Sequence, residues 1–141
     1  MSLWVLDTDH VSLFQNGHPN VSQRVNAVSP EKIAVTIITF EEQVRGRLHV
    51  IRQADSSDKL VTAYSRLEAT LNYFNNINLL PFNQEAANYY AEFLRQKVRI
   101  GTQDLRIAAI VISNDGILVT RNEKDFSRVP GLRFEDWTME D

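Results

Sequence analysis

The stretch LWVLDTDH, residues 3–10, joins a short apolar run to a cluster of ionisable side chains. Its first half suits a buried strand, whereas its second half brings Asp7, Asp9 and His10 directly to the end of that strand. Charged groups are costly to remove from water unless they are paired, hydrogen-bonded or bound to a metal. The end of this strand is therefore a candidate functional site.

The overall composition is that of an ordinary folded protein. The 141 residues are 43% apolar and 23% charged, which is enough to build one domain with its own core. The longest apolar run, residues 107–112, is far shorter than the roughly 20 residues of a membrane-spanning helix. The start of the chain has no signal-peptide pattern, so we expect a cytoplasmic protein without a membrane partner. The absence of cysteine excludes disulfides and zinc–thiolate sites.

Short apolar runs alternate with longer amphipathic segments. The runs predict strands at 3–6, 32–35, 77–82, 117–120 and 132–134. The other segments predict helices at 8–14, 21–28, 39–53 and 58–74, one from Asn83 to Gly101, and one at 103–113. Such alternation favours parallel strands joined by right-handed crossovers. We predict an α/β fold, a single domain over residues 1–141 with a short, mostly parallel central sheet of four to five strands flanked by helices.

Apolar periodicity indicates how the helices are oriented. In the helix at 58–74 one stripe repeats at steps of three and four residues, formed by Leu60, Tyr64, Leu67, Leu71 and Phe74. In the helix after Asn83 one face holds Ala87, Tyr90, Leu94 and Val98. The helix at 103–113 is apolar nearly all round, which predicts that it is buried.

Acidic and amide side chains come from four distant segments. Asp7 ends the first strand, Glu42 lies early in the helix after the second, Asp104 opens the buried helix, and Asn122 and Asp125 follow the fourth strand. The carboxyl ends of parallel strands share one edge, where sites of such folds lie. Converging carboxylates repel one another, and a hard divalent cation relieves that repulsion. Mg²⁺ or Mn²⁺ held by oxygen ligands can activate water for attack on phosphorus.

Each acid also has a purely structural explanation. The spacing Thr39-x-x-Glu42 fits a helix capping box. Asp9 and Asp104 lie in first helical turns, where the helix dipole favours an acid. Asp125 fits a turn. The convergence of all four segments favours a site over these separate explanations.

Four stretches resemble elements of the PIN-domain ribonucleases, particularly the VapC-type toxins of bacterial toxin–antitoxin pairs. LWVLDTDH is similar to the opening strand of that family, and ITFEEQVRG, residues 38–46, is similar to its Glu-x-x-x-Gly element, with Glu42 in the acidic position. IGTQDLRIAA, residues 100–109, resembles the third element and places its acid at Asp104. ILVTRNEKDFSRVPGLRFEDW, residues 117–137, resembles the C-terminal block.

The resemblance implies a metal-dependent endoribonuclease that uses Mg²⁺ or Mn²⁺. It implies that Asp7 and Asp104 are metal ligands and that Glu42 is a ligand, directly or through water, that also orients the attacking water. The fourth acidic position of many relatives is Asn122 here, so either Asn122 or Asp125 fills that role. The resemblance further implies a toxin, a cognate antitoxin that blocks the site, and a homodimer.

The net charge of −3 does not oppose an RNA substrate. Without the four acids of the predicted catalytic set, namely Asp7, Glu42, Asp104 and Asp125, the chain holds 15 basic and 14 acidic residues. Basic residues flank these acids and are either RNA-backbone contacts or solvated surface residues: Arg99, Arg106, Arg121 and Lys124.

Two other functions are alternatives. The pattern D-x-D-x-V also resembles haloacid-dehalogenase-type phosphatases, with Asp7 as nucleophile and Asp9 as general acid/base. His10 stands where that family has glycine, and Glu42 and Asp104 have no place in it. A catalytically silent PIN domain that binds RNA or protein is the other alternative, favoured by Asn122. For His10 itself we predict a helix-face or hydrogen-bonding role near the site, not metal ligation.

Overall fold

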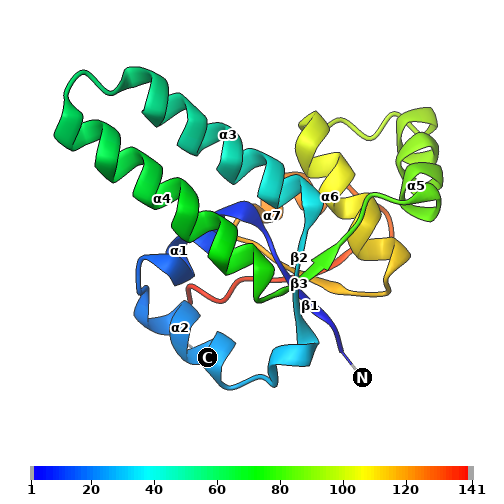
Figure 1. Ribbon diagram of the computed structural model, residues 1–141. Helices are drawn as coiled ribbons and strands as arrows, with labels where there is room; N and C mark the ends of the chain where they lie inside the picture. The colour runs from blue at the N-terminus through cyan, green and yellow to red at the C-terminus, as the bar shows by residue number, and fades with distance from the viewer. Residues whose placement is uncertain (1, 140–141) are drawn as a thin grey trace.

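The computed structural model describes residues 2–139 and places five strands in one parallel sheet. The strands are β1 (Trp4–Leu6), β2 (Ile33–Thr36), β3 (Asn78–Leu80), β4 (Ile117–Val119) and β5 (Arg133–Glu135). Their order across the sheet is β3-β2-β1-β4-β5, and each neighbouring pair is parallel (Figure 1). The prediction of an α/β fold with a short parallel sheet is confirmed.

Helices cover both faces of this sheet. Within residues 2–139 they are α1 (Thr8–Gln15), α2 (Pro19–Asn26), α3 (Ile37–Gln53), α4 (Ser57–Asn75), α5 (Gln84–Arg95), α6 (Thr102–Ser113) and α7 (Glu123–Phe126), with a 3-10 turn at Pro30–Lys32. Successive strand residues point to opposite faces. Val5 therefore belongs to a core with α5 and α6, whereas its neighbour Leu6 belongs to a core with α1, α2 and Trp137.

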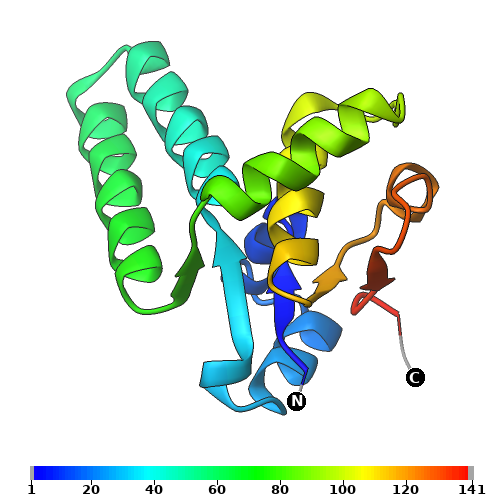
Figure 2. The ribbon, with the colours of Figure 1, turned by 90° about the vertical axis from the view of Figure 1, so that its right-hand side faces the viewer.

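The centre of the sheet is buried on both faces. Val5, Leu6, Leu118 and Val119, in the two central strands, are fully buried. Helix α6 is buried along most of its length, as its composition predicts, and α5 packs beside it (Figure 2). This rigid centre holds the C-terminal ends of β1 and β4 in place, and the predicted acids follow those ends.

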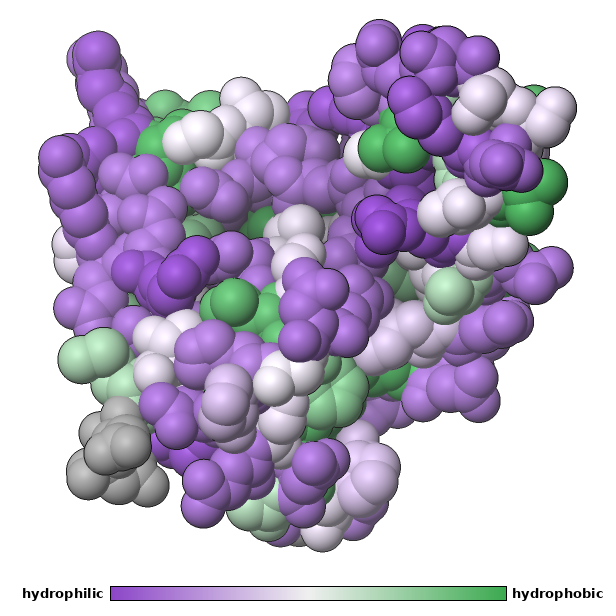
Figure 3. Space-filling model, turned by 90° about the vertical axis from the view of Figure 1, so that its left-hand side faces the viewer, coloured by the Kyte–Doolittle hydropathy of each residue, from purple (hydrophilic) through white to green (hydrophobic). Residues whose placement is uncertain are grey.

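The α3–α4 hairpin projects beyond the sheet (Figures 1 and 2). The apolar stripe predicted along α4 is mostly exposed there: Leu60 is 41%, Tyr64 55% and Leu71 51% exposed, and only Phe74 is buried. The main packing partner of α4 is α3, so one helix covers few of its side chains. The face seen from the hairpin side is mainly hydrophilic, with hydrophobic residues in separate patches (Figure 3).

Helix α5 buries the predicted face only in part: Tyr90 packs against the core, but two residues outside the predicted stripe are buried more deeply. Ala86 and Phe93 are buried, whereas Leu94 is 52% exposed. The helix ends at Arg95, so Val98 lies beyond it and the predicted stripe is interrupted. Within residues 2–139 no helix has both the length and the apolar character to span a membrane.

Candidate active site

Asp7 is mounted at the end of the central strand β1. Its backbone N–H donates to the Val119 carbonyl of β4 at 3.0 Å, and its side chain caps α1 by accepting the His10 backbone N–H at 2.8 Å. An aspartate at this cap position satisfies a donor that the helix leaves unpaired. The residue is 8% exposed, so its carboxylate is held tightly and yet reaches the surface.

Glu42 reaches the same region from α3. The helix begins at Ile37 with Thr36 as its cap, so a capping box of Thr39 and Glu42 does not explain the position of Glu42. The Glu42 side chain instead points across to α1, where the Thr8 hydroxyl donates to its Oε1 at 2.6 Å. This contact between two elements fixes one carboxylate oxygen of Glu42.

Asp104 lies in the first turn of α6, after a cap at Gly101 that offers no side-chain hydrogen bond. Burial first, and then the negative charges of Glu42, Asp7 and Asp125, together raise the pKa of its carboxyl from the ordinary 3.8 to about 6. A carboxylate feels neighbouring charges at short range. The carboxylates of Glu42, Asp7 and Asp125, which come from three other segments, therefore lie close enough to Asp104 to act on it.

A pocket of about 340 Å³ opens where these segments meet. It is lined by Asp7, Thr8, Asp9, Glu42, Asp104, Arg121, Asn122 and Phe126. The structure thus brings together four of the predicted metal and catalytic residues, Asn122 among them, and one predicted RNA contact, Arg121. Asp125 lies close enough to act on Asp104 but does not line the pocket.

The two candidates for the fourth position contact each other. Asn122 caps the short helix α7, its Oδ1 accepting the Asp125 backbone N–H at 3.4 Å. Its Nδ2 donates to Asp125 Oδ2 at 3.1 Å. Helix α7 was not predicted, although an asparagine before acidic residues is a recognisable helix-start signal. Thr8 and Phe126 were not predicted as lining residues either, because a threonine or phenylalanine by itself gives little chemical signal in a sequence.

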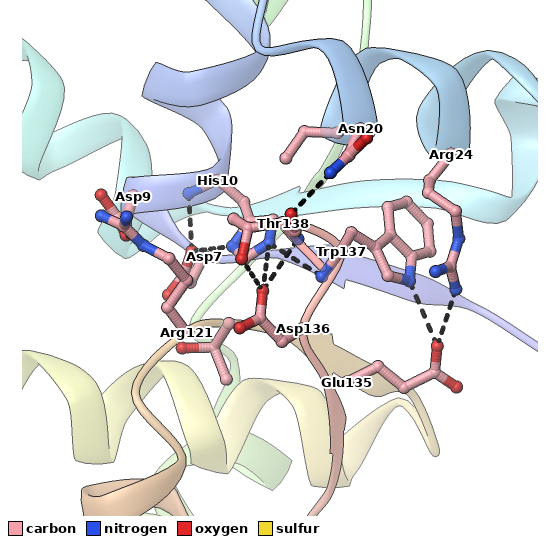
Figure 4. A network of polar contacts seen from close by, with 12 residues as sticks. Asp7, Asp9, His10, Asn20, Arg24, Arg121, Glu135, Asp136, Trp137 and Thr138 are labelled. Carbon is pink, nitrogen blue, oxygen red and sulfur yellow. Dashed lines mark hydrogen bonds and ion pairs between the residues drawn. The ribbon is translucent and has the colours of Figure 1, made fainter. Parts of the chain in front are cut away.

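Arg121 is the basic residue of the pocket lining. Its Nε lies 2.6 Å from Asp9 Oδ2, and both side chains are about half exposed (Figure 4). The other predicted RNA contacts lie outside the lining: Arg106 stacks over Tyr90 at 5.6 Å, and Arg99 and Lys124 are exposed. Pairing with Arg121 also gives Asp9 a role other than the acid/base role of the phosphatase alternative.

The donor atoms that line the pocket are hard oxygens. Across residues 2–139, no three histidine, aspartate or glutamate side chains already stand in a group that could hold a metal ion. Mg²⁺ and Mn²⁺ bind through carboxylate, carbonyl and water oxygens, and the lining offers carboxylates and one amide. The chemistry of the donors fits such an ion, and the metal itself stays a prediction.

Known proteins share both the sequence pattern and the fold. The family model of the PIN domain matches residues 4–132. The chain is 27% identical to Ribonuclease VapC1 of Haemophilus influenzae (strain R2866) and 30% identical to Ribonuclease VapC2 of Rickettsia felis, each over 96% of this chain and 98% of the relative. The solved structure of VapBC2 from Rickettsia felis bound to a DNA fragment from their promoter matches with a TM-score of 0.73 at 26% identity, covering 96% of this chain and 98% of that one.

Proposed function

The chain belongs to the PIN-domain family and is of the VapC type, and on that premise we propose that it is a metal-dependent endoribonuclease and the toxin of a toxin–antitoxin pair. One observation carries the proposal. Asp7, Glu42 and Asp104 come from three distant segments to a single pocket, and their mutual repulsion contributes to the raised pKa of Asp104. Because the PIN-domain model matches residues 4–132, the chain is not assigned to the haloacid-dehalogenase-type phosphatases.

Asp7 and Asp104 would hold Mg²⁺ or Mn²⁺, with Glu42 binding directly or through water. Asn122 is the better candidate for the fourth position because it lines the pocket and Asp125 does not. A bound ion supplies positive charge for the phosphate and a water of lowered pKa. The carboxylates of Asp7, Glu42 and Asp104 suit that purpose, because a cation would relieve the repulsion among them, and Asn122 adds a neutral oxygen.

Two residues of the pocket can orient the attacking water and bind the RNA backbone. Glu42 has one oxygen fixed by Thr8 and a second that can orient water towards phosphorus. Arg121 at the pocket edge can bind a phosphate oxygen of the RNA backbone. Hydrolysis adds the water oxygen to phosphorus and breaks the bond between phosphorus and the 3′ oxygen. That oxygen leaves with a proton as a 3′-hydroxyl, and the other fragment keeps a 5′-phosphate.

The proposed partners are an RNA substrate, a cognate antitoxin and a second copy of the chain. The antitoxin is supported by the likeness to VapBC2 of Rickettsia felis, and the ribonuclease activity by the names of the relatives. The homodimer rests on the family resemblance alone. An RNA substrate is also consistent with the predicted location in the cytoplasm.

A cleavage assay tests the function directly. The purified chain is mixed with a panel of structured and unstructured RNAs, and separately with p-nitrophenyl phosphate, in Mg²⁺, Mn²⁺ or EDTA. We expect RNA cleavage that requires metal, 5′-phosphate ends, and no release of p-nitrophenol. RNA binding without cleavage in any metal would favour the silent PIN domain instead. A small DNA-binding protein encoded in the neighbouring reading frame would support the antitoxin separately.

A further inference from the structure

His10 is the most deeply buried ionisable side chain beside the pocket. It is 0% exposed and lies between Asp7 and the C-terminal segment that follows β5 (Figure 4). Its Nδ1 lies 3.2 Å from Asp7 Oδ1, and its Nε2 lies 3.2 Å from the backbone nitrogen of Trp137. The imidazole therefore connects the candidate metal ligand to a segment more than a hundred residues away in sequence.

The Trp137 contact fixes which ring nitrogen carries the proton. A backbone N–H can only donate, so Nε2 of His10 must accept and must be unprotonated. The proton of the neutral ring is then on Nδ1, and it is donated to Asp7 Oδ1. The Asp136 carboxylate is 3.7 Å from Nε2, but its Oδ1 already accepts the backbone N–H and the hydroxyl of Thr138, at 2.8 and 2.6 Å.

The C-terminal segment is anchored well enough to hold this arrangement. Trp137 is 1% exposed and packs on Trp4 with ring centroids 5.4 Å apart. Arg24 of α2 lies over the Trp137 ring at 5.2 Å and pairs with Glu135 at 3.3 Å. The Asn20 side chain donates to the Thr138 carbonyl at 2.8 Å (Figure 4). The backbone N–H of Trp137 is thus held at a defined place opposite His10.

We propose that His10 is a positioning residue for Asp7. Its Nδ1–H, set by the Trp137 backbone, holds one carboxylate oxygen of Asp7 and fixes the orientation of the other. Both hydrogen bonds to the Asp7 side chain fall on Oδ1, and within residues 2–139 Oδ2 accepts none. Hydrogen bonds of this kind orient metal ligands, and their loss commonly weakens metal binding by about 10- to 100-fold. The metal part of this inference rests on the proposed function.

Two substitutions of His10 test its two ring nitrogens separately. Asparagine places its amide near the position of Nδ1, so His10→Asn keeps a donor for Asp7 and loses the acceptor for Trp137. Glutamine places its amide near Nε2, so His10→Gln keeps that acceptor and loses the donor. Mn²⁺ affinity of residues 1–141 is measured by calorimetry, and melting followed by circular dichroism checks that each variant is folded.

We expect His10→Gln to bind Mn²⁺ about 10-fold or more weakly than the wild type, and His10→Asn to bind it within about threefold. Equal losses in both variants, or no loss in His10→Gln, would overturn the positioning role. Asp7→Asn is measured alongside. If Asp7→Asn binds Mn²⁺ as well as the wild type, the proposed metal ligand fails instead.

A second measurement needs neither variants nor metal. Nitrogen-15 NMR of histidine-labelled wild-type protein distinguishes the two neutral tautomers by their ring-nitrogen shifts. We expect the His10 signals to show a protonated Nδ1 and an unprotonated Nε2. A proton on Nε2 would overturn the proposal even if the chain is an active ribonuclease.

Discussion

The guanidinium Nε of Arg121 lies 2.6 Å from Asp9 Oδ2, and the two residues face each other from β4–α7 and α1 across the edge of the acidic pocket. The positive charge of Arg121 lies near the carboxylates of Asp7, Glu42 and Asp104. Without a nearby positive charge, those carboxylates would repel a phosphate backbone. Because both side chains are about half exposed, the pair itself contributes little to stability. Its place at the pocket edge is the basis of the proposed contact between Arg121 and a phosphate of the RNA backbone.

Arg121→Ala should weaken RNA binding without unfolding the chain. We expect the slope of log Kd against log salt concentration to fall by about 0.7 to 1, the loss of one phosphate contact. Binding is measured by fluorescence anisotropy in the Asp7→Asn background, where RNA stays intact. Arg133→Ala is the matched control, because Arg133 also pairs with an exposed aspartate, Asp115. Asp115 precedes the N-terminal end of β4, whereas Arg121 follows its C-terminal end. Equal effects of the two changes would contradict a phosphate contact at Arg121.

Asn122 and Asp125 should contribute unequally to metal binding. Because Asn122 lines the pocket, Asn122→Ala is expected to weaken Mn²⁺ binding more than Asp125→Ala does, measured by calorimetry. Asn122→Ala also removes the cap of α7, which costs about 1 kcal/mol of stability. Asn122→Ser separates the two effects, since serine can cap the helix but has no amide. A larger loss in Asp125→Ala would assign the fourth position to Asp125.

Asp104→Asn should stabilise the metal-free protein at neutral pH. The pKa of Asp104 is raised to about 6 in the folded chain, so folding favours the protonated acid and its ionisation destabilises the fold. We expect a gain of up to about 1 kcal/mol at pH 7.5, less than the full shift implies because solvent screens this half-buried group. The gain should shrink as pH falls through 6 and vanish below about 4. Urea unfolding in EDTA at several pH values measures it, and a gain that grows in acid would contradict the account.

Tyr73→Phe should raise stability. Burial raises the pKa of the Tyr73 hydroxyl to about 12, and that hydroxyl finds no hydrogen-bond partner among residues 2–139. Phenylalanine keeps the ring contact with Phe74, whose centroid is 5.2 Å away, and removes the unpaired oxygen. We expect a gain of about 1 kcal/mol in thermal unfolding. Tyr64→Phe, at a 55% exposed tyrosine, should change little. A loss in Tyr73→Phe would show that the hydroxyl has a partner.

The sequence was informative where one local rule dominated. Asp7, Glu42 and Asp104 could be placed together because the ends of parallel strands share an edge. The buried helix α6 could be recognised because its apolar residues leave no polar side.

Other features depended on packing between distant segments. The exposed stripe of α4 has the periodicity of a buried one, and only the projecting hairpin explains why Leu60 and Leu71 remain uncovered. The Thr8 contact to Glu42 joins residues 34 positions apart, and the Trp137 contact to His10 joins residues 127 apart. No local pattern in a single sequence predicts such pairs, so the roles of Thr8 and Trp137 could not be predicted from it.

The most direct test of the central claim is RNA cleavage by Asp7→Asn. The substitution removes the charge of the residue that ends β1 and keeps its shape and its capping oxygen. We expect the variant to melt near the wild-type temperature, to lose Mn²⁺ affinity and to cleave RNA at less than about 1% of the wild-type rate, a barrier increase of about 3 kcal/mol or more. Asp58→Asn, at an exposed aspartate of α4, should cleave normally. Wild-type cleavage by folded Asp7→Asn would contradict the account.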